Sequence, residues 1–285
     1  MVETRYADLD EVRLSYRTMG EGPELVVLLH GWPQTGLCWR HVLPALAERY
    51  TVVVPDLRGY GSSGLAATGY DKRATAADLH QLIVHLGHGS ALVAGHDRGA
   101  RVAHRWALDH PGDVRRLALL DILPTREVMT TYDRRSATAM WHWFFHLQPE
   151  LPELLLAGNV EPYLNFFFRR PRASGAIDDE TFEEYVSAFS EPGHLRASLE
   201  DYRAGFGVDL DLDERDHTDG NVLGQPLLLL WGGDGGLRDK DVLGVWRQYA
   251  TDVRGTAVAE CGHYVPEEQP AVVAAELLAF FGERD

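Results

Sequence analysis

A run of five residues, Gly95–Gly99 (GHDRG), places an aspartate between two glycines, directly after an apolar run and directly before a helical pattern. The spacing G-x-nucleophile-x-G is typical of a sharp strand-to-helix turn that presents its central side chain to a substrate. Glycine is needed on both sides because larger side chains would clash in so tight a turn. A carboxylate such as Asp97 needs no activating base, attacks saturated carbon and forms an ester. The turn therefore predicts dehalogenation or epoxide opening rather than esterase or protease chemistry.

Asp97 could also be a plain helix N-cap, so the prediction depends on the other parts that such a nucleophile needs. The run HGWP, residues 30–33, ends an early strand, where the backbone N–H of Trp32 can stabilise an oxyanion. The backbone N–H of Arg98, directly after the nucleophile, is expected to be the second donor. Of the 13 histidines, His263 follows the last strand-like run, where the base is expected.

The acid that orients the base has three candidates. Asp121 follows a strand that ends at Leu120, whereas Asp234 and Asp239 follow the later run Leu227–Trp231. Many enzymes with this turn carry the acid in a W-G-x-x-D run, but here Asp234 stands one residue too early. We therefore predict Asp121 as the acid, with Asp234 and Asp239 as rivals.

These residues must be positioned by short apolar strands that alternate with helices, a pattern typical of a mostly parallel α/β sheet. Strands are expected at Arg13–Thr18, Leu25–Leu29, Thr51–Leu57, Ala91–Gly95, Leu117–Leu120, Leu227–Trp231 and Thr256–Ala259. Helices are expected at Cys38–Arg49, Thr75–Leu86, from the GHDRG turn to about His110, at Val242–Tyr249 and at Ala271–Phe280.

The rhythm changes between residues 124 and 224, where the chain is helical and aromatic and has no strong strand-like run. It contains WHWFFH at 141–146 and YLNFFF at 163–168. We therefore expect a core of residues 1–123 and 225–285, interrupted by a helical cap of residues 124–224. The acidic stretch Asp209–Asp219 is expected to be a solvated loop.

The composition describes an ordinary globular protein of 285 residues, 45% hydrophobic and 25% charged. A net charge of −16 argues against nucleic acid or an anionic membrane as a partner, because a protein that binds either of them needs basic patches on its surface. No apolar run reaches the roughly 18 residues of a membrane span, and no signal-peptide core is visible, so we expect a cytoplasmic protein.

The numbers of cysteines and of arginines bear on metal binding and on carboxylate binding, respectively. Cys38 and Cys261 are the two cysteines of the chain, which is too few for a zinc framework. All but two of the 27 basic residues are arginines, the exceptions being Lys72 and Lys240. Arginine binds carboxylates through two parallel hydrogen bonds, which lysine cannot do.

The chain resembles the fluoroacetate dehalogenases of the α/β-hydrolase superfamily over nearly its whole length. The resemblance is carried by HDRGARVAHRWALDHP (96–111), LLDILPT (119–125), WHWFF (141–145), EDYRAG (200–205) and CGHYVPEEQP (261–270). It implies an eight-stranded, mostly parallel sheet with helices on both faces and an inserted helical cap. It further implies hydrolysis of a small anionic haloacetate to glycolate and halide, without cofactor or metal, by a homodimer.

The resemblance also assigns roles to five side chains. Arg98 and Arg101 are expected to bind the substrate carboxylate, because their spacing places both on one side of the helix start. The ring N–H groups of His142 and Trp143 and the hydroxyl of Tyr202 are expected to stabilise the departing halide. Trp32 departs from the Phe or Tyr that the family often carries there, which bears on substrate range.

Two alternatives stay open. An epoxide hydrolase, or a dehalogenase of larger 2-haloacids, could use the same nucleophile. An epoxide hydrolase would need two cap tyrosines, for which the candidates are Tyr132, Tyr163, Tyr185 and Tyr202. A neutral epoxide, however, has no obvious use for Arg98 and Arg101. A non-catalytic ligand-binding protein of the same fold is the alternative from another class, and the complete set of Asp97, His263 and Asp121 argues against it.

Overall fold

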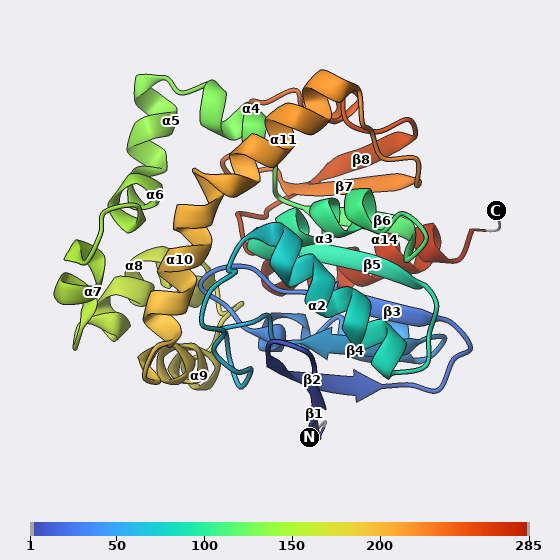
Figure 1. The fold of residues 1–285 in the computed structure, drawn as a ribbon, viewed down its shortest axis with the longest axis horizontal. Coiled ribbons are helices and arrows are strands. Elements are labelled where there is room, and N and C mark those ends of the chain that lie inside the picture. Colours follow the sequence, from blue (N-terminus) through green and yellow to red (C-terminus); the bar gives the residue numbers. More distant parts are fainter. Residues whose placement is uncertain (1–2, 284–285) are drawn as a thin grey trace.

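The central strands are apolar on both faces, as strands covered by helices on each side must be. In the computed structural model, which describes residues 3–283, β3 (Leu25–Leu29) and β5 (Ala91–His96) are buried along their whole length. They lie in an eight-stranded sheet of order β1-β2-β4-β3-β5-β6-β7-β8 (Figure 1). The other strands are β1 (Thr4–Asp8), β2 (Arg13–Met19), β4 (Thr51–Pro55), β6 (Val114–Leu120), β7 (Leu227–Gly232) and β8 (Val253–Val258). β2 pairs antiparallel with β1 and β4, and all other pairs are parallel, so the predicted fold class is confirmed.

Two apolar clusters sandwich the sheet. On one face pack α2 (Lys72–His85), α3 (Arg98–Asp109) and α12 (Val242–Trp246). On the other pack η1 (Gly36–Trp39), α1 (Leu43–Ala47), α13 (Val265–Glu268) and α14 (Pro270–Phe281). Helices on both faces exclude water from the central parallel strands, so the carboxyl ends of these strands form a rigid edge on which side chains can be positioned.

Between β6 and β7 the chain leaves the sheet, and all the regular elements of this segment are helices joined by short loops. Figure 1 shows this segment, the cap, beside the sheet. Its helices are α4 (Thr125–Thr130), α5 (Arg134–Ala139), α6 (Trp141–His146), α7 (Leu151–Leu156), α8 (Val160–Ala173), α9 (Asp179–Ser190), α10 (His194–Gly205) and α11 (Val208–Asp219).

Several expected elements differ from the structure. The stretch Asp209–Asp219 is not a loop but belongs to α11, in which Asp209 and Leu212 are buried. The expected helix Cys38–Arg49 is broken into η1 and α1, and Pro44 stands at the start of α1, where its missing N–H costs nothing. β8 begins and ends earlier than expected because this edge strand is largely exposed and lacks a clear apolar run. The antiparallel edge strand β1, equally exposed, was not expected.

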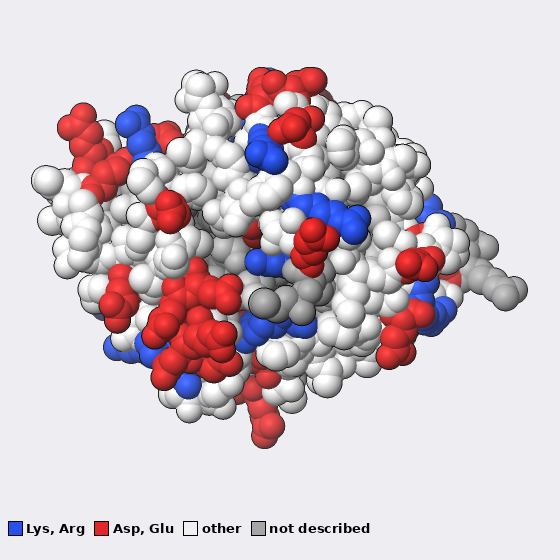
Figure 2. All heavy atoms as spheres, turned by 90° about the horizontal axis from the view of Figure 1, so that it is seen from below, with Lys and Arg blue, Asp and Glu red and all other residues white. Residues whose placement is uncertain are grey.

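Surface features agree with the composition. On the face shown in Figure 2, acidic side chains gather in patches and basic side chains lie between them in small groups. Cys38 and Cys261 are both buried and free. Within residues 3–283, no helix combines the length and the apolarity that crossing a bilayer requires.

Candidate active site

The GHDRG turn is as strained as its sequence predicts. Asp97 stands alone between β5 and α3, with φ 48° and ψ −116°, a region that side-chain-bearing residues rarely adopt. A Cβ on Gly95 would lie 2.7 Å from the backbone of α3, and one on Gly99 would lie 2.3 Å from the carbonyl oxygen of His30. Both positions therefore require glycine, and the turn projects Asp97 away from the sheet edge.

A chain of hydrogen bonds orders the residues around Asp97. Its Oδ1 accepts a hydrogen bond of 2.9 Å from the backbone N–H of Trp32, while its Oδ2 lies 3.7 Å from Nε2 of His263. Nδ1 of His263 lies 2.6 Å from Oδ2 of Asp121, whose Oδ1 accepts from the N–H of Gly232 at 2.9 Å. One oxygen of Asp97 is thus held by an oxyanion donor, and the other is available for attack.

The rival acids lie elsewhere. Asp234 is exposed and pairs with Arg170 at 3.2 Å, and Asp239 is exposed and pairs with Arg135 at 3.2 Å. Neither carboxylate contacts His263, so Asp121 is the one of the three candidates that lies within hydrogen-bonding distance of the expected base.

Charges in the site set the protonation states. Burial opposes a charge on His263, but the hydrogen bond and charge of Asp121 and the charge of Asp97 raise its pKa to about 9. Burial would raise the pKa of Asp97, yet the charges of His263, His96 and Arg98 lower it overall. At neutral pH Asp97 is therefore an anion, as a nucleophile must be, and His263 is a cation.

A cavity of about 320 Å³ lies between these residues and the cap. Polar side chains that line it include Asp97, Arg101, His142, Trp143, Tyr202 and His263. Apolar side chains that line it include Ile122, Leu123, Val128, Met140, Phe167 and Leu237. The exposed Lys240 borders the same cavity. The His263 side chain is 37% exposed, so water in the cavity can reach it.

The structure brings the three expected halide donors together at this cavity. The ring centroid of Tyr202 lies 5.5 Å from that of Trp143 and 6.0 Å from that of His142. None of the three makes a side-chain hydrogen bond to any described residue, so their donors remain available to a ligand. Burial lowers the pKa of His142 to about 3, which leaves its imidazole neutral with one N–H.

Arg98 forms an ion pair with a residue of the cap. Its Nε and Nη2 donate to the carboxylate of Asp201 at 2.9 and 2.7 Å, and the guanidinium lies 4.4 Å from the ring centroid of Tyr202. Asp201 also accepts from the hydroxyl of Tyr60 and contacts Lys72. These two donors of Arg98 are therefore already paired with a cap carboxylate, and the expectation that Arg98 binds the substrate carboxylate stays a prediction. Only Nη1 of Arg98 lacks a partner.

Arg101, by contrast, forms no salt bridge with any described residue, although the charges of Asp97 and Asp213 act on it. Its Nη1 donates to the carbonyl of Leu123 at 3.2 Å and to the hydroxyl of Thr125 at 3.0 Å, and its Nε is buried without a partner. Within residues 3–283, every other buried arginine has a carboxylate partner. These pairs are Arg58 with Asp78, Arg98 with Asp201, Arg105 with Asp109 and Asp216, and Arg116 with Glu283. Burial and the charge of Arg98 lower the pKa of Arg101, as expected of an unpaired cation.

Comparison with known proteins agrees with this geometry. A family model described as the alpha/beta hydrolase fold matches residues 24–270. The chain belongs to the α/β-hydrolase family. A soluble epoxide hydrolase from Corynebacterium sp. (strain C12) is 38% identical over 96% of both chains. A fluoroacetate dehalogenase from Burkholderia sp is 36% identical over 99% of this chain and 94% of its own.

Solved structures of similar hydrolases share the whole fold. ALR0039 from Nostoc sp PCC 7120 superposes with a TM-score of 0.94 at 41% identity, covering 99% of both chains. The epoxide hydrolase CorEH superposes with a TM-score of 0.91 at 35% identity, again over 99% of both. The chain is thus about equally identical in sequence to a dehalogenase and to epoxide hydrolases. Its own side chains must therefore distinguish between the two activities.

Two supporting residues were missed by sequence reasoning. His96 precedes the nucleophile, and its Nε2 lies 2.8 Å from the carbonyl oxygen of His263. Burial and the charge of His263 lower the pKa of His96 to about 4, so a neutral ring donates this bond and holds the backbone of the base. The second supporting residue is Asp201, which accepts two hydrogen bonds from Arg98 and holds its guanidinium against the ring of Tyr202. Its place directly before Tyr202 was the one available signal.

Proposed function

We propose that the protein is a haloacid dehalogenase that converts a small haloacetate, such as fluoroacetate or chloroacetate, to glycolate and halide. The unpaired guanidinium of Arg101 beside Asp97 carries this proposal. A buried cation without a partner is costly, and a substrate carboxylate would compensate it. Lys240 adds a second positive charge at the cavity, and the similarity to a fluoroacetate dehalogenase supports the same substrate class.

In the first step, Arg101, which lines the cavity, binds the carboxylate. Oδ2 of Asp97 attacks the α-carbon in line, a C–O bond forms, and the halide leaves with the electron pair of the broken bond. Charge develops on the leaving halide, and the donors of His142, Trp143 and Tyr202 are positioned to stabilise it.

In the second step, His263 removes a proton from water, and the resulting hydroxide attacks Cγ of the Asp97 ester. The backbone N–H groups of Trp32 and Arg98 stabilise the tetrahedral intermediate. Glycolate then leaves with the former Oδ2, and one oxygen of water remains in the carboxylate of Asp97. The products are glycolate, halide and a proton, and the scheme requires no cofactor.

The two steps should differ in their dependence on pH. His263 must be neutral to hydrolyse the ester, and its pKa is about 9 in the resting site. Ester formation removes the negative charge of Asp97, so the pKa of His263 should then fall below that value. We expect ester hydrolysis to accelerate as the pH rises and to level off below about pH 9, while ester formation proceeds at neutral pH. Rapid-quench single turnovers would measure both rates, and a hydrolysis rate that falls with rising pH would contradict this assignment.

Arg101→Gln tests the carboxylate site directly. Loss of a charge-assisted hydrogen bond costs about 1.5–3 kcal/mol, which corresponds to a roughly 10- to 150-fold rise in the KM for fluoroacetate. Arg134→Gln, which removes an exposed arginine of the cap, is the matched control and should leave the KM unchanged. An unaltered KM in Arg101→Gln would show that the carboxylate binds elsewhere.

Epoxide hydrolysis is the second candidate, favoured by the apolar part of the cavity and by the relative at 38% identity. Against it, Tyr202 is the one tyrosine among the four candidates that lines the cavity. The other hydroxyls contact Met129 (from Tyr132), His146 (from Tyr163) and Glu267 (from Tyr185). Fluoride release from fluoroacetate, chloride release from chloroacetate and diol formation from styrene oxide, measured side by side, separate the two activities.

A further inference from the structure

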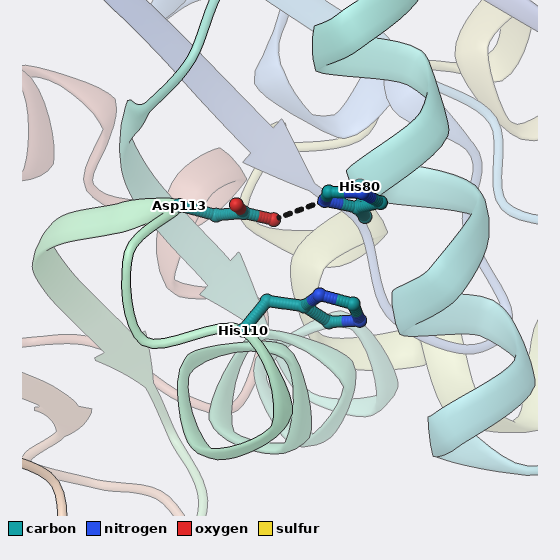
Figure 3. Close-up of side chains that lie close together, drawn as sticks. All are labelled: His80, His110 and Asp113. Carbon is teal, nitrogen blue, oxygen red and sulfur yellow. Dashed lines mark hydrogen bonds and ion pairs between the residues drawn. The ribbon is translucent and has the colours of Figure 1, made fainter.

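A cluster of side chains that can ligate a metal ion lies far from Asp97. His80 on α2, His110 at the end of α3 and Asp113 before β6 have ligand atoms within 4.8 Å of one another (Figure 3). Asp113 precedes the seven-residue strand β6, and Asp121 follows it. At about 3.3 Å per residue, the strand separates Asp113 from Asp121 by roughly 25 Å.

The backbone holds two of the three residues in place. The N–H of Asp113 donates to the carbonyl of His110 at 3.0 Å, which closes a tight turn between α3 and β6. The carbonyl of Asp113 in turn accepts from the N–H of Ala91 on β5 at 2.7 Å. His80 comes from α2, which packs beside α3. The spacing of the three side chains is therefore set by a closed turn and a neighbouring helix.

The carboxylate of Asp113 is oriented from the protein interior. The buried indole of Trp106 donates its N–H to Oδ2 of Asp113 at 2.8 Å, and Nδ1 of His80 lies 2.8 Å from the same oxygen. Carboxylates and imidazoles that bind metals are commonly held in this way by hydrogen bonds from behind. Oδ1 of Asp113 and both ring nitrogens of His110 have no hydrogen-bond partner among the described residues.

Solvent reaches the cluster, and nearby cations are already paired. The His80 side chain is 41% exposed, and the ring of His110 stacks on it at 4.5 Å with an interplanar angle of 13°. Arg73 and Arg105 pair with Asp109 at 2.7 and 3.0 Å. An incoming cation therefore finds a carboxylate that no arginine neutralises.

We propose that His80, His110 and Asp113 form a binding site for a divalent transition-metal ion such as Zn²⁺. Two imidazole nitrogens and one carboxylate oxygen suit zinc, cobalt, nickel and copper, whereas magnesium and calcium prefer oxygen ligands alone. On binding, the ring of His110, which no hydrogen bond holds, turns out of the stack toward the carboxylate. Any proton on a ligating nitrogen leaves to solvent, and water completes the coordination. The ion would link α2 to the turn between α3 and β6, which makes it a stabilising site rather than a catalytic one.

Calorimetric titration with Zn²⁺ tests the proposal on the full chain. We expect one ion per chain in the wild type and at least a tenfold loss of affinity in His80→Gln and in His110→Gln. His85→Gln removes an exposed histidine from the same helix and should bind as the wild type does. Trp106→Phe, which releases the carboxylate, should weaken binding roughly tenfold. Zn²⁺ should raise the Tm of the wild type and of His85→Gln, but not of the two ligand variants.

Thermal unfolding without metal checks that each variant folds. Should a variant fail to fold, selective broadening of the His80 and His110 imidazole NMR signals by Co²⁺ in the wild type locates the site without mutation. The proposal is overturned if the wild type takes up no Zn²⁺ at millimolar concentration. It is also overturned if His80→Gln and His110→Gln bind as the wild type does, or if binding is lost in His263→Gln instead.

Discussion

Asp97→Asn should abolish turnover, with a fall in kcat of at least roughly 10⁴-fold. An amide is a poor nucleophile, so the ester cannot form, whereas the side-chain oxygen can still accept the hydrogen bond that Trp32 donates to Oδ1. Fluoride or chloride release measures the loss. Asp234→Asn is the matched control, because Asp234 lies in an exposed ion pair with Arg170, and it should retain the wild-type rate.

Isotope labelling tests the same covalent step without mutation. In a single turnover in ¹⁸O-water, the label should enter the carboxylate of Asp97 and not glycolate, because the oxygen of the product comes from Oδ2. Label in glycolate at the first turnover would mean that water attacks the substrate directly. In that case Asp97 would not be the nucleophile, even if Asp97→Asn is inactive.

His263→Asn should form the ester and fail to hydrolyse it. The attack of Asp97 needs no base, whereas the water that hydrolyses the ester does. Loss of the imidazolium removes one charge that lowers the pKa of Asp97, but a carboxylate in its ordinary range is still ionised at neutral pH. We therefore expect a burst of about one halide per active site and no further turnover.

Mass spectrometry should locate the trapped ester as a carboxymethyl group on the peptide that contains Asp97. His85→Asn, at an exposed position of α2, should turn over normally and accumulate no adduct. Continued turnover in His263→Asn would exclude His263 as the base. Absence of both burst and adduct would instead mean that His263 is needed before the ester forms.

The sequence predicted those parts of the site that depend on local sterics and on chain order. Gly95 is required by contact with the backbone of Ala100 within the turn, whereas Gly99 is required by the backbone of Leu29 and His30 on β3 and the residue after it. The local pattern GHDRG was nevertheless sufficient to predict the strained aspartate. Asp121 follows β6 and His263 comes after β8, two parallel strands on either side of β7 whose carboxyl ends lie at one edge of the sheet. Their proximity was therefore predictable from the order of the strands, although the distance of 2.6 Å was not.

The long-range charge pairs were not predictable, because each joins positions far apart in the chain. Asp209–Asp219 has the composition of a solvated loop, yet Asp209 is buried in α11, where it accepts the N–H of Lys72 at 2.8 Å and lies 3.5 Å from its ammonium group. An aspartate gives the same residue in the sequence whether its carboxylate is paired in the interior or exposed to water. Only the packing of the cap on α2 distinguishes them.

Arg98 and Arg101 show the same limit within the active site. The sequence determined that the two arginines lie on one side of a helix start, directly after Asp97. This spacing predicted a site for an anion. Only the tertiary structure decided that Arg98 is neutralised by Asp201 of the cap while Arg101 keeps an unpaired charge at the cavity. The physical reason is that a buried cation is available to a ligand only if no protein carboxylate reaches it first, and that depends on how distant segments pack.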